Sequence, residues 1–145
     1  MKKAYLALFV GLLSGVMACS TGPQPIKAGV EACDFCKMTI SQENFGGEII
    51  TKKGKVYKFD DLHCLSAFRH EKMDSNDIKA VYFINFLAPH NFLDPGKVFL
   101  LNSRNLHSPM GGNTAAFDSK EKLAETQQKV DGSEITMQQL YNNNK

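Results

Sequence analysis

The stretch EIITKKGKVYKFDDLHCLSAF, residues 48–68, predicts a β-hairpin that is followed at once by a helix. Two runs rich in β-branched and aromatic residues, 48–51 and 56–59, flank a turn of lysines and glycine, which is typical of a hairpin. Asp60 or Asp61 then supplies a helix N-cap, and the apolar residues that follow recur at the spacing of one helix face. The sequence therefore predicts strands and helices in one chain, an α+β fold.

The rest of the chain continues this mixture of strands and helices. Ile78 to Phe86 is dense in β-branched and aromatic residues and is the clearest strand. Asp118, with Glu121 three residues later, resembles a capping box that opens a helix to about Lys129, and Gly132 ends this helix. Further expected elements are strands at 98–101 and 114–117, a turn-rich link at 91–96, and a short last helix from Thr136 with Gln139 in the matching box position.

Two segments of the chain share a similar order of residues, which predicts an internal duplication. Phe59-Asp60 and Phe117-Asp118 each precede a helix, each follows a Gly-Gly pair, and each has a loop methionine farther upstream. A repeated strand-strand-helix-strand unit explains this similarity. We therefore expect two small ββαβ-like units, residues 30–88 and 89–145, that form one compact globular region and bring the second loop methionine toward the first.

The N-terminal segment predicts export and a lipid anchor. Residues 1–18 combine a basic start with an apolar run, which is typical of a signal peptide. Cys19 follows a small-residue cleavage site directly, as in the lipobox of bacterial lipoproteins, so Cys19 is the expected lipidated residue. Residues 19–29 then include a Pro- and Gly-containing tether. The expected location is a bacterial cell membrane, inner or outer, facing the periplasm.

The charge balance gives no indication of nucleic-acid binding. The whole chain has 17 basic and 15 acidic side chains, and both of the basic residues in 1–18 are lysines. Removal of the signal peptide therefore leaves a chain near neutrality. We expect no nucleic-acid partner.

The motif CDFCKM, residues 33–38, gathers three sulfur side chains, those of Cys33, Cys36 and Met38. Thiolate and thioether donors suit Cu(I) better than any hard cation. If Cys19 is acylated, Cys33, Cys36 and Cys64 remain, and this odd number cannot form a complete disulfide framework. A Cys33–Cys36 disulfide in the metal-free protein is compatible with export.

Two other functions are compatible with the cysteines alone. A C-x-x-C pair can serve an exported thiol–disulfide oxidoreductase, but that chemistry expects the pair at a helix N-terminus, and the residues after Met38 read as strand. A zinc-stabilised module requires a second ligand pair at a familiar spacing, and the sequence contains none. No hydrolase motif is present either, so we expect a protein that is not an enzyme.

Three ordered motifs together resemble the NosL family: CDFCKM at 33–38, FDDLHC at 59–64 and PMGGNTAAF at 109–117. The resemblance implies a lipoprotein copper chaperone that helps to assemble the copper centres of nitrous oxide reductase. The implied fold is an α+β arrangement of two ββαβ-like units, akin to part of organomercurial lyase. The implied partners are apo-nitrous oxide reductase, its copper-maturation transporter machinery and the membrane that holds the anchor.

The resemblance also implies the copper ligands. Cys36 and Met38 correspond to the ligands of the first motif, and Met110 is the expected further donor. Cys33, His107 and Cys64 are additional candidates, although Cys64 also lies on the apolar face of its predicted helix and is compatible with simple burial. The chain departs from the family pattern at Lys37, where a glycine usually precedes the methionine, and lysine adopts positive φ poorly.

An exposed set of two or three soft ligands fits a Cu(I) chaperone on chemical grounds as well. Such a set leaves a coordination position open for a ligand from the acceptor protein, whereas a closed four-ligand site suits a structural metal. Copper affinity is expected to rise with pH up to the pKa of the Cys36 thiol, because the thiol must lose its proton to bind.

Overall fold

The predicted hairpin is present in the computed structural model, which describes residues 22–142. Strand β1 (Gly47–Thr51) pairs antiparallel with β2 (Val56–Phe59), so that Gly47 lies opposite Phe59 and Ile50 opposite Val56. All five residues of β1 are buried, because β1 is an interior strand of its sheet. The expectations for the signal peptide and for Cys19 fall outside the described residues.

Helix α1 (Leu62–Lys72) begins directly after the hairpin, as predicted. The Oδ1 atom of Asp61 caps it by accepting a hydrogen bond of 2.8 Å from the backbone N–H of His63. The helix packs closely on β1 at Gly47, where an added Cβ would lie 2.8 Å from Cδ1 of Leu65 and 2.5 Å from the carbonyl oxygen of Tyr82. A glycine is therefore required at the contact between helix and sheet.

Strand β3 (Ile78–Ile84) pairs with the other edge of β1, and β4 (Phe92–Leu93) completes the first sheet in the order β2-β1-β3-β4. β3 ends two residues before the predicted Phe86, because Asn85 turns to form an isolated parallel bridge with Ala116 of the second unit. The turn-rich link expected at 91–96 contains the short strand β4, which the sequence did not predict.

The second half of the chain repeats the topology of the first. Strand β5 (Phe99–Asn102) lies between β6 (Thr114–Phe117) and β7 (Ser133–Ile135), and α2 (Lys120–Val130) connects the last two strands. In each unit the first strand is central, the second pairs on one side, and the strand after the helix pairs on the other. The prediction of an α+β fold made of two ββαβ units is confirmed.

The two helices start in the same register relative to their strands. Phe59 ends β2 and Phe117 ends β6, both are fully buried, and each helix begins three residues later. The capping box expected at Asp118 is wrong. Ser119 is the N-cap of α2, because its extended backbone lets Oγ accept a hydrogen bond of 3.3 Å from the N–H of Lys122.

The last helix, α3 (Met137–Asn142), has the predicted cap. The N–H of Thr136 donates to Oε1 of Gln139 at 2.7 Å, and the N–H of Gln139 donates to Oγ1 of Thr136 at 3.1 Å. Strand β7 was not predicted, because it is three residues long and largely polar. Three short 3₁₀ segments complete the described elements: η1 (Glu43–Phe45), η2 (Ser75–Asp77) and η3 (Pro95–Lys97).

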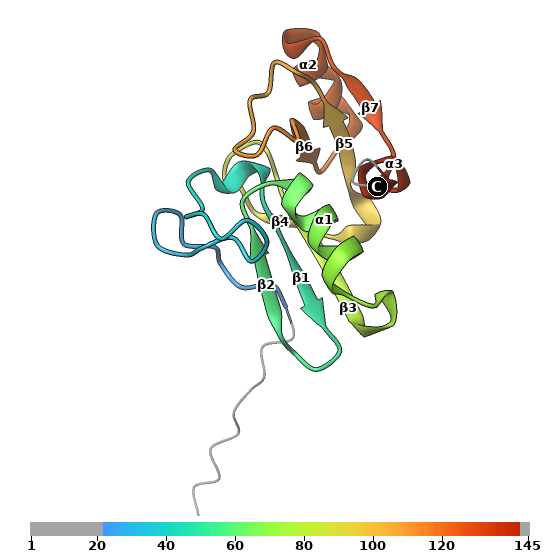
Figure 1. Ribbon diagram of the computed structural model, residues 1–145. Coiled ribbons are helices and arrows are strands. Elements are labelled where there is room, and N and C mark those ends of the chain that lie inside the picture. The colour runs from blue at the N-terminus through green and yellow to red at the C-terminus, as the bar shows by residue number, and fades with distance from the viewer. Residues whose placement is uncertain (1–21, 143–145) are drawn as a thin grey trace, which may run out of the picture.

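The two units pack into one body, as Figure 1 shows. The larger of two hydrophobic clusters includes Leu65 and Phe83 of the first unit and Leu100 and Leu140 of the second. Every strand and helix of the described chain lies between residues 43 and 142, so a chain that starts at residue 20 retains both cores. Among residues 22–142, no helix is long and apolar enough to cross a membrane.

Candidate metal centre

The CDFCKM loop is fixed to the hairpin by its own backbone and by Asp34. The N–H of Cys33 donates to the carbonyl of Met38 at 2.8 Å, which closes the loop on itself. The N–H of Asp34 donates to the carbonyl of Lys58 at 2.8 Å, and Oδ2 of Asp34 accepts from the N–H of Lys58 at 2.8 Å. The loop is therefore attached to β2 two residues before Asp60.

Four side chains converge where β2 ends and α1 begins. The Sγ atoms of Cys33, Cys36 and Cys64 and a carboxylate oxygen of Asp60 all lie within 4.8 Å of one another. We call these four residues the sulfur cluster. Cys33 and Cys64 are fully buried, Asp60 is 2% exposed and Cys36 is half-buried, so the cluster opens to solvent at Cys36. All three cysteines are free thiols.

The three thiols differ in acidity because of their hydrogen bonds. The Cys64 thiol donates to Cys33 and lowers the pKa of Cys33 to about 6; burial opposes this shift, and nearby backbone N–H groups assist it. The same hydrogen bond, together with burial, raises the pKa of Cys64. Burial is also the main cause of the raised pKa of Cys36. These shifts favour the thiolate at Cys33 and the protonated thiol at Cys36 and Cys64.

Asp60 and Asp61 have different roles although they are neighbours. Oδ1 of Asp60 lies 3.9 Å from Sγ of Cys36 and belongs to the cluster. Oδ2 of Asp61 instead accepts hydrogen bonds from Oγ of Ser108 at 2.6 Å and from the N–H of Met110 at 2.8 Å. The loop of the second unit is therefore attached to the cap of α1.

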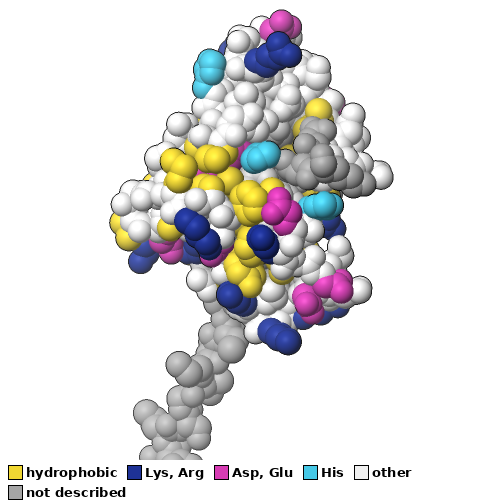
Figure 2. All heavy atoms as spheres, viewed as in Figure 1, with side chains coloured by type: hydrophobic (Ala, Val, Ile, Leu, Met, Phe, Trp, Pro, Cys, Tyr) yellow, Lys and Arg dark blue, Asp and Glu magenta, His cyan; other side chains and the backbone are white. Residues whose placement is uncertain are grey.

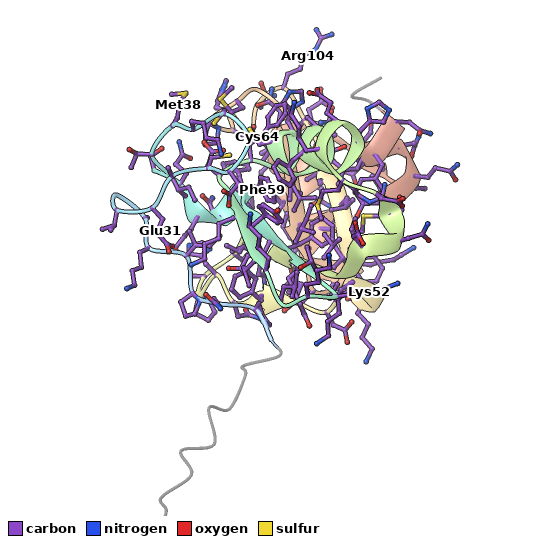
Figure 3. The ribbon with its side chains drawn as sticks, turned by 60° about the horizontal axis from the view of Figure 1, so that its bottom comes forward. Glu31, Met38, Lys52, Phe59, Cys64 and Arg104 are labelled. Atoms are coloured by element: carbon purple, nitrogen blue, oxygen red, sulfur yellow. The ribbon has the colours of Figure 1, made fainter. Side chains whose placement is uncertain are left out.

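The structure places the predicted sulfur donors at different depths. Met38 and Met110 have exposed side chains, at 57% and 37% of their surface, and Figure 3 shows Met38 projecting from the edge of the molecule. Cys36 is intermediate in exposure between these methionines and the buried pair Cys33 and Cys64. His107 is exposed, and it is not one of the four residues of the cluster.

Lys37 adopts a left-handed backbone conformation, with φ of 65°. This is the position at which the resemblance expects glycine, which adopts positive φ without steric cost. The loop thus keeps a glycine-like turn despite the lysine. The hydrogen bond of 3.0 Å from the N–H of Lys37 to the carbonyl of Cys33 accompanies this turn.

Sequence reasoning did not include Asp60 among the metal-binding candidates. The sequence does contain one signal for Asp60: it precedes Cys64 by four residues, and α1 begins between them, which brings the two side chains together. The second unit has Asp118 and Lys122 at the corresponding positions, and they form an ion pair of 2.7 Å. Both units thus bring these two positions together, but only the first has a cysteine there.

The CDFCKM motif does not open a helix. Residues 34–36 form a turn, and Thr39 makes an isolated bridge with Ala32. The first α-helix among residues 22–142 starts only at Leu62. This arrangement differs from the helix N-terminus that a thioredoxin-like C-x-x-C requires.

Comparisons with known proteins identify one family. The family model of NosL matches residues 24–143. The crystal structure of the copper chaperone NosL from Shewanella denitrificans matches with a TM-score of 0.70 and 21% sequence identity, over 81% of this chain and 93% of that chain. At this identity the likeness shows a shared fold. No curated protein matches the sequence significantly.

Proposed function

The chain belongs to the NosL family, and we propose that it is a Cu(I) metallochaperone that is exported, anchored to the membrane through a lipid on Cys19, and supplies copper to nitrous oxide reductase. The solved relative is described as a copper chaperone, and a chaperone carries its metal as cargo without catalysing a reaction. The role in nitrous oxide reductase maturation, with its transporter machinery, rests on the three motifs that resemble the family.

The observation that carries the proposal is the convergence of three cysteine sulfur atoms, of which one, that of Cys36, belongs to a half-buried side chain. Cys33, Cys36 and Cys64 come from two separate segments, and their sulfur atoms nevertheless lie within 4.8 Å of one another and of Asp60. Soft thiolates favour Cu(I) over Mg²⁺, Ca²⁺ and other hard cations. A buried sulfur set with one accessible member can hold the ion and still release it.

We assign the exchange of copper to Cys36, Met38 and Met110. Cys36 is the accessible thiol of the cluster, and Met38 is exposed two residues further along the loop. Met110 is exposed on a loop whose backbone bonds to Asp61, next to Asp60. A thioether carries no proton, so both methionines remain donors at any pH. Cys33, Cys64 and His107 are the additional candidate ligands.

The rival function is an exported thiol–disulfide oxidoreductase that uses Cys33 and Cys36. The pKa of about 6 for Cys33 resembles that of a reactive thiol. However, Cys33 is fully buried, whereas an attacking thiolate must reach the disulfide of its substrate. The copper function requires no such access to Cys33, and the geometry therefore favours it.

Competition for Cu(I) tests the proposal. Reduced protein that starts at residue 20 is titrated with Cu(I) against a chromophoric chelator, followed by the variants Cys36→Ser and Met38→Leu. We expect the parent protein to compete and both substitutions to weaken binding, Cys36→Ser more strongly because a thiolate contributes charge. Met73→Leu, at the opposite end of α1, is the matched control and should leave affinity unchanged.

The same samples separate the rival function. A protein that cannot compete with the chelator, or whose affinity is unaffected by both substitutions at 36 and 38, is not the proposed chaperone. Turnover of a disulfide substrate that is lost in both Cys33→Ser and Cys36→Ser would instead establish the oxidoreductase.

A further inference from the structure

Five exposed lysines gather at the end of the first unit that is farthest from the sulfur cluster. We call this surface the lysine end. It joins the turn between β1 and β2, the last residue of α1 and the start of β3, because Thr51 pairs with Ile78 and the N–H of Lys52 donates to the carbonyl of Asp77 at 2.8 Å. Its lysines are Lys52, Lys53, Lys55, Lys72 and Lys79.

The lysine end and the sulfur cluster lie at opposite ends of the same elements. β2 runs from the turn to Phe59, beside Asp60, and α1 runs back from Leu62 to Lys72. The ten residue steps of α1 alone span about 15 Å. Figure 2 shows most of the blue Lys and Arg side chains of this face on the middle and lower body, where the hairpin lies in Figure 1, with Asp and Glu side chains among them. In Figure 3, Lys52 and Cys64 occupy different sides.

Most of these ammonium groups lack a neutralising partner. Among the described residues, Lys52, Lys53 and Lys79 form no ion pair; Lys72 has only a long contact of 3.9 Å with Glu71, and Lys55 lies 4.5 Å from the ring centre of Tyr57. The carboxylates at this end are those of Glu71, Asp74 and Asp77. Five lysines facing three carboxylates leave an excess of positive charge.

The lysine end also contains a hollow of about 280 Å³. Its lining combines three lysines with two carboxylates and two apolar side chains, namely Lys53, Lys55, Lys72, Asp74, Asp77, Tyr57 and Met73. The ammonium groups outnumber the carboxylates by one. Ammonium groups around a partly apolar hollow fit the phosphate of a lipid headgroup together with the first carbons attached to it. This chemistry selects an anionic surface as the occupant.

The length of the tether restricts which part of the protein can lie on the membrane. The N–H of Gln24 is fixed to Oε2 of Glu48 at 2.9 Å, and Glu48 pairs with Lys58 in the half of the hairpin away from the turn, so the tether must run along the hairpin to bring the lipid to the lysine end. Cys19 lies five residues earlier, and five extended residues reach at most about 17 Å. A lipid on Cys19 therefore keeps the bilayer close to the first unit. Figure 1 shows the chain entering the fold at its lower end, toward the turn between β1 and β2.

We propose that the lysine end rests on the anionic phospholipid surface of the membrane, so that the sulfur cluster at the opposite end faces away from the bilayer. The inference rests on the lipid anchor of the proposed function. Basic side chains that lie within a Debye length of an anionic leaflet are attracted to it individually. The anchor supplies attachment, and the lysines supply orientation.

Vesicle binding tests the surface without the anchor. Protein that starts at residue 20 is sedimented with phosphatidylglycerol–phosphatidylcholine vesicles and with pure phosphatidylcholine vesicles at low salt. We expect binding only to the anionic vesicles, with loss in high salt. The triple variant K52E/K53E/K55E should weaken binding at least about tenfold. The matched control K97E/R104E/K129E changes the same charge on exposed residues of the second half and should bind as the parent does.

Amine footprinting tests orientation in the acylated full-length protein. An impermeant acylating reagent should modify Lys53 and Lys55 several-fold more slowly in anionic vesicles than in neutral ones, whereas Lys129 should react equally in both. Equal reaction of all three lysines, or equal loss of vesicle binding in both triple variants, overturns the proposal. K52E/K53E/K55E should keep the Cu(I) affinity of the parent protein. Failure of the vesicle experiments with copper binding intact therefore refutes only the lysine end, whereas a parent protein that does not compete for Cu(I) refutes the proposed function.

Discussion

Met110 and Asp61 are joined by a hydrogen bond of 2.8 Å from the backbone N–H of Met110 to Oδ2 of Asp61. The same carboxylate caps α1 through its other oxygen, which accepts from His63. One buried side chain thus fixes the start of the helix that carries Cys64 and the loop that carries Met110. Asp61 thus links the two units beside the sulfur cluster, where Gly112 also packs against His63.

Asp61→Asn is therefore expected to disturb both elements. The amide can still cap α1 with its oxygen, but its nitrogen cannot accept from Ser108 and Met110. Loss of these bonds in a buried position should lower the free energy of unfolding by about 2–3 kcal/mol, measured by urea denaturation. Asp118→Asn is the control at the neighbouring register of the second unit, where loss of an exposed ion pair should cost less than about 1 kcal/mol.

Cu(I) affinity should rise with pH through the neutral range, because each protonated thiol that becomes a ligand must release its proton. The pKa of Cys33, about 6, predicts no proton release from Cys33 above that pH. The pKa values of Cys36 and Cys64 are raised, so these thiols remain protonated. The slope of Cu(I) affinity against pH, measured by chelator competition from pH 7 to 9, therefore gives the number of these two thiols that bind copper.

A tenfold rise per pH unit indicates one thiol from this pair, and a hundredfold rise indicates both. Cys36→Ser should reduce the slope by one proton. A flat profile in the parent protein would exclude both residues as ligands.

The raised pKa of Glu48 predicts that the folded protein loses stability as pH rises. Burial raises the pKa of Glu48 from 4.5 to about 7, and its Oε1 has no hydrogen-bond partner among the described residues. The folded protein binds this proton more tightly than the unfolded chain does, so the stabilisation is complete below pH 4.5 and is lost as pH rises to about 7. Glu48→Gln should remove this dependence and raise the free energy of unfolding at pH 8 by at most about 3 kcal/mol.

Glu31 provides the control of opposite sign. Burial acts to raise its pKa, but the hydrogen bonds and charge of Lys58, with help from Lys27, lower it overall. Its contribution is present above the ordinary carboxylate pKa and is lost as pH falls through the lowered value. Glu31→Gln should therefore destabilise the protein at neutral pH. Thermal denaturation measured across pH checks both variants. If the stability of both variants changes with pH as that of the parent protein does, these assignments are contradicted.

Lys37→Gly should stabilise the CDFCKM loop. Lys37 has a φ of 65°, which costs a non-glycine residue about 1–2 kcal/mol. Glycine removes this cost but gains freedom in the unfolded chain, which leaves a net gain of about 0.5–1 kcal/mol. Lys37→Ala removes the same side chain and should give no such gain. Equal stability of the glycine and alanine variants would show that the backbone conformation is not the cause.

Much of the fold could be predicted from local patterns. The hairpin at 48–59, the helix after Asp61 and the Thr136 cap each depend on neighbouring residues, and all three are present. Strands β4 and β7 were missed because they have only two and three residues and are defined by their partners across the sheet. Their own composition carries too little signal.

The candidate site was predictable only in part, for the same reason. The spacing of the CDFCKM motif indicated the soft donors of one loop. The apolar face of α1 indicated burial of Cys64, which is correct, but gave no sign that Cys64 meets Cys33. Asp60 reads as a possible helix cap in the sequence, and only the packing of the loop against β2 reveals that its carboxylate joins the sulfurs.

The attachment of Asp34 to Lys58 bears on the speed of copper exchange. Two hydrogen bonds of 2.8 Å, made by protein groups alone, hold the loop against β2. A loop that is already ordered loses little conformational entropy when it captures an ion and regains little when it releases one. Exchange with a partner is then governed by the replacement of one sulfur ligand by another, without a folding step between the loaded and empty forms.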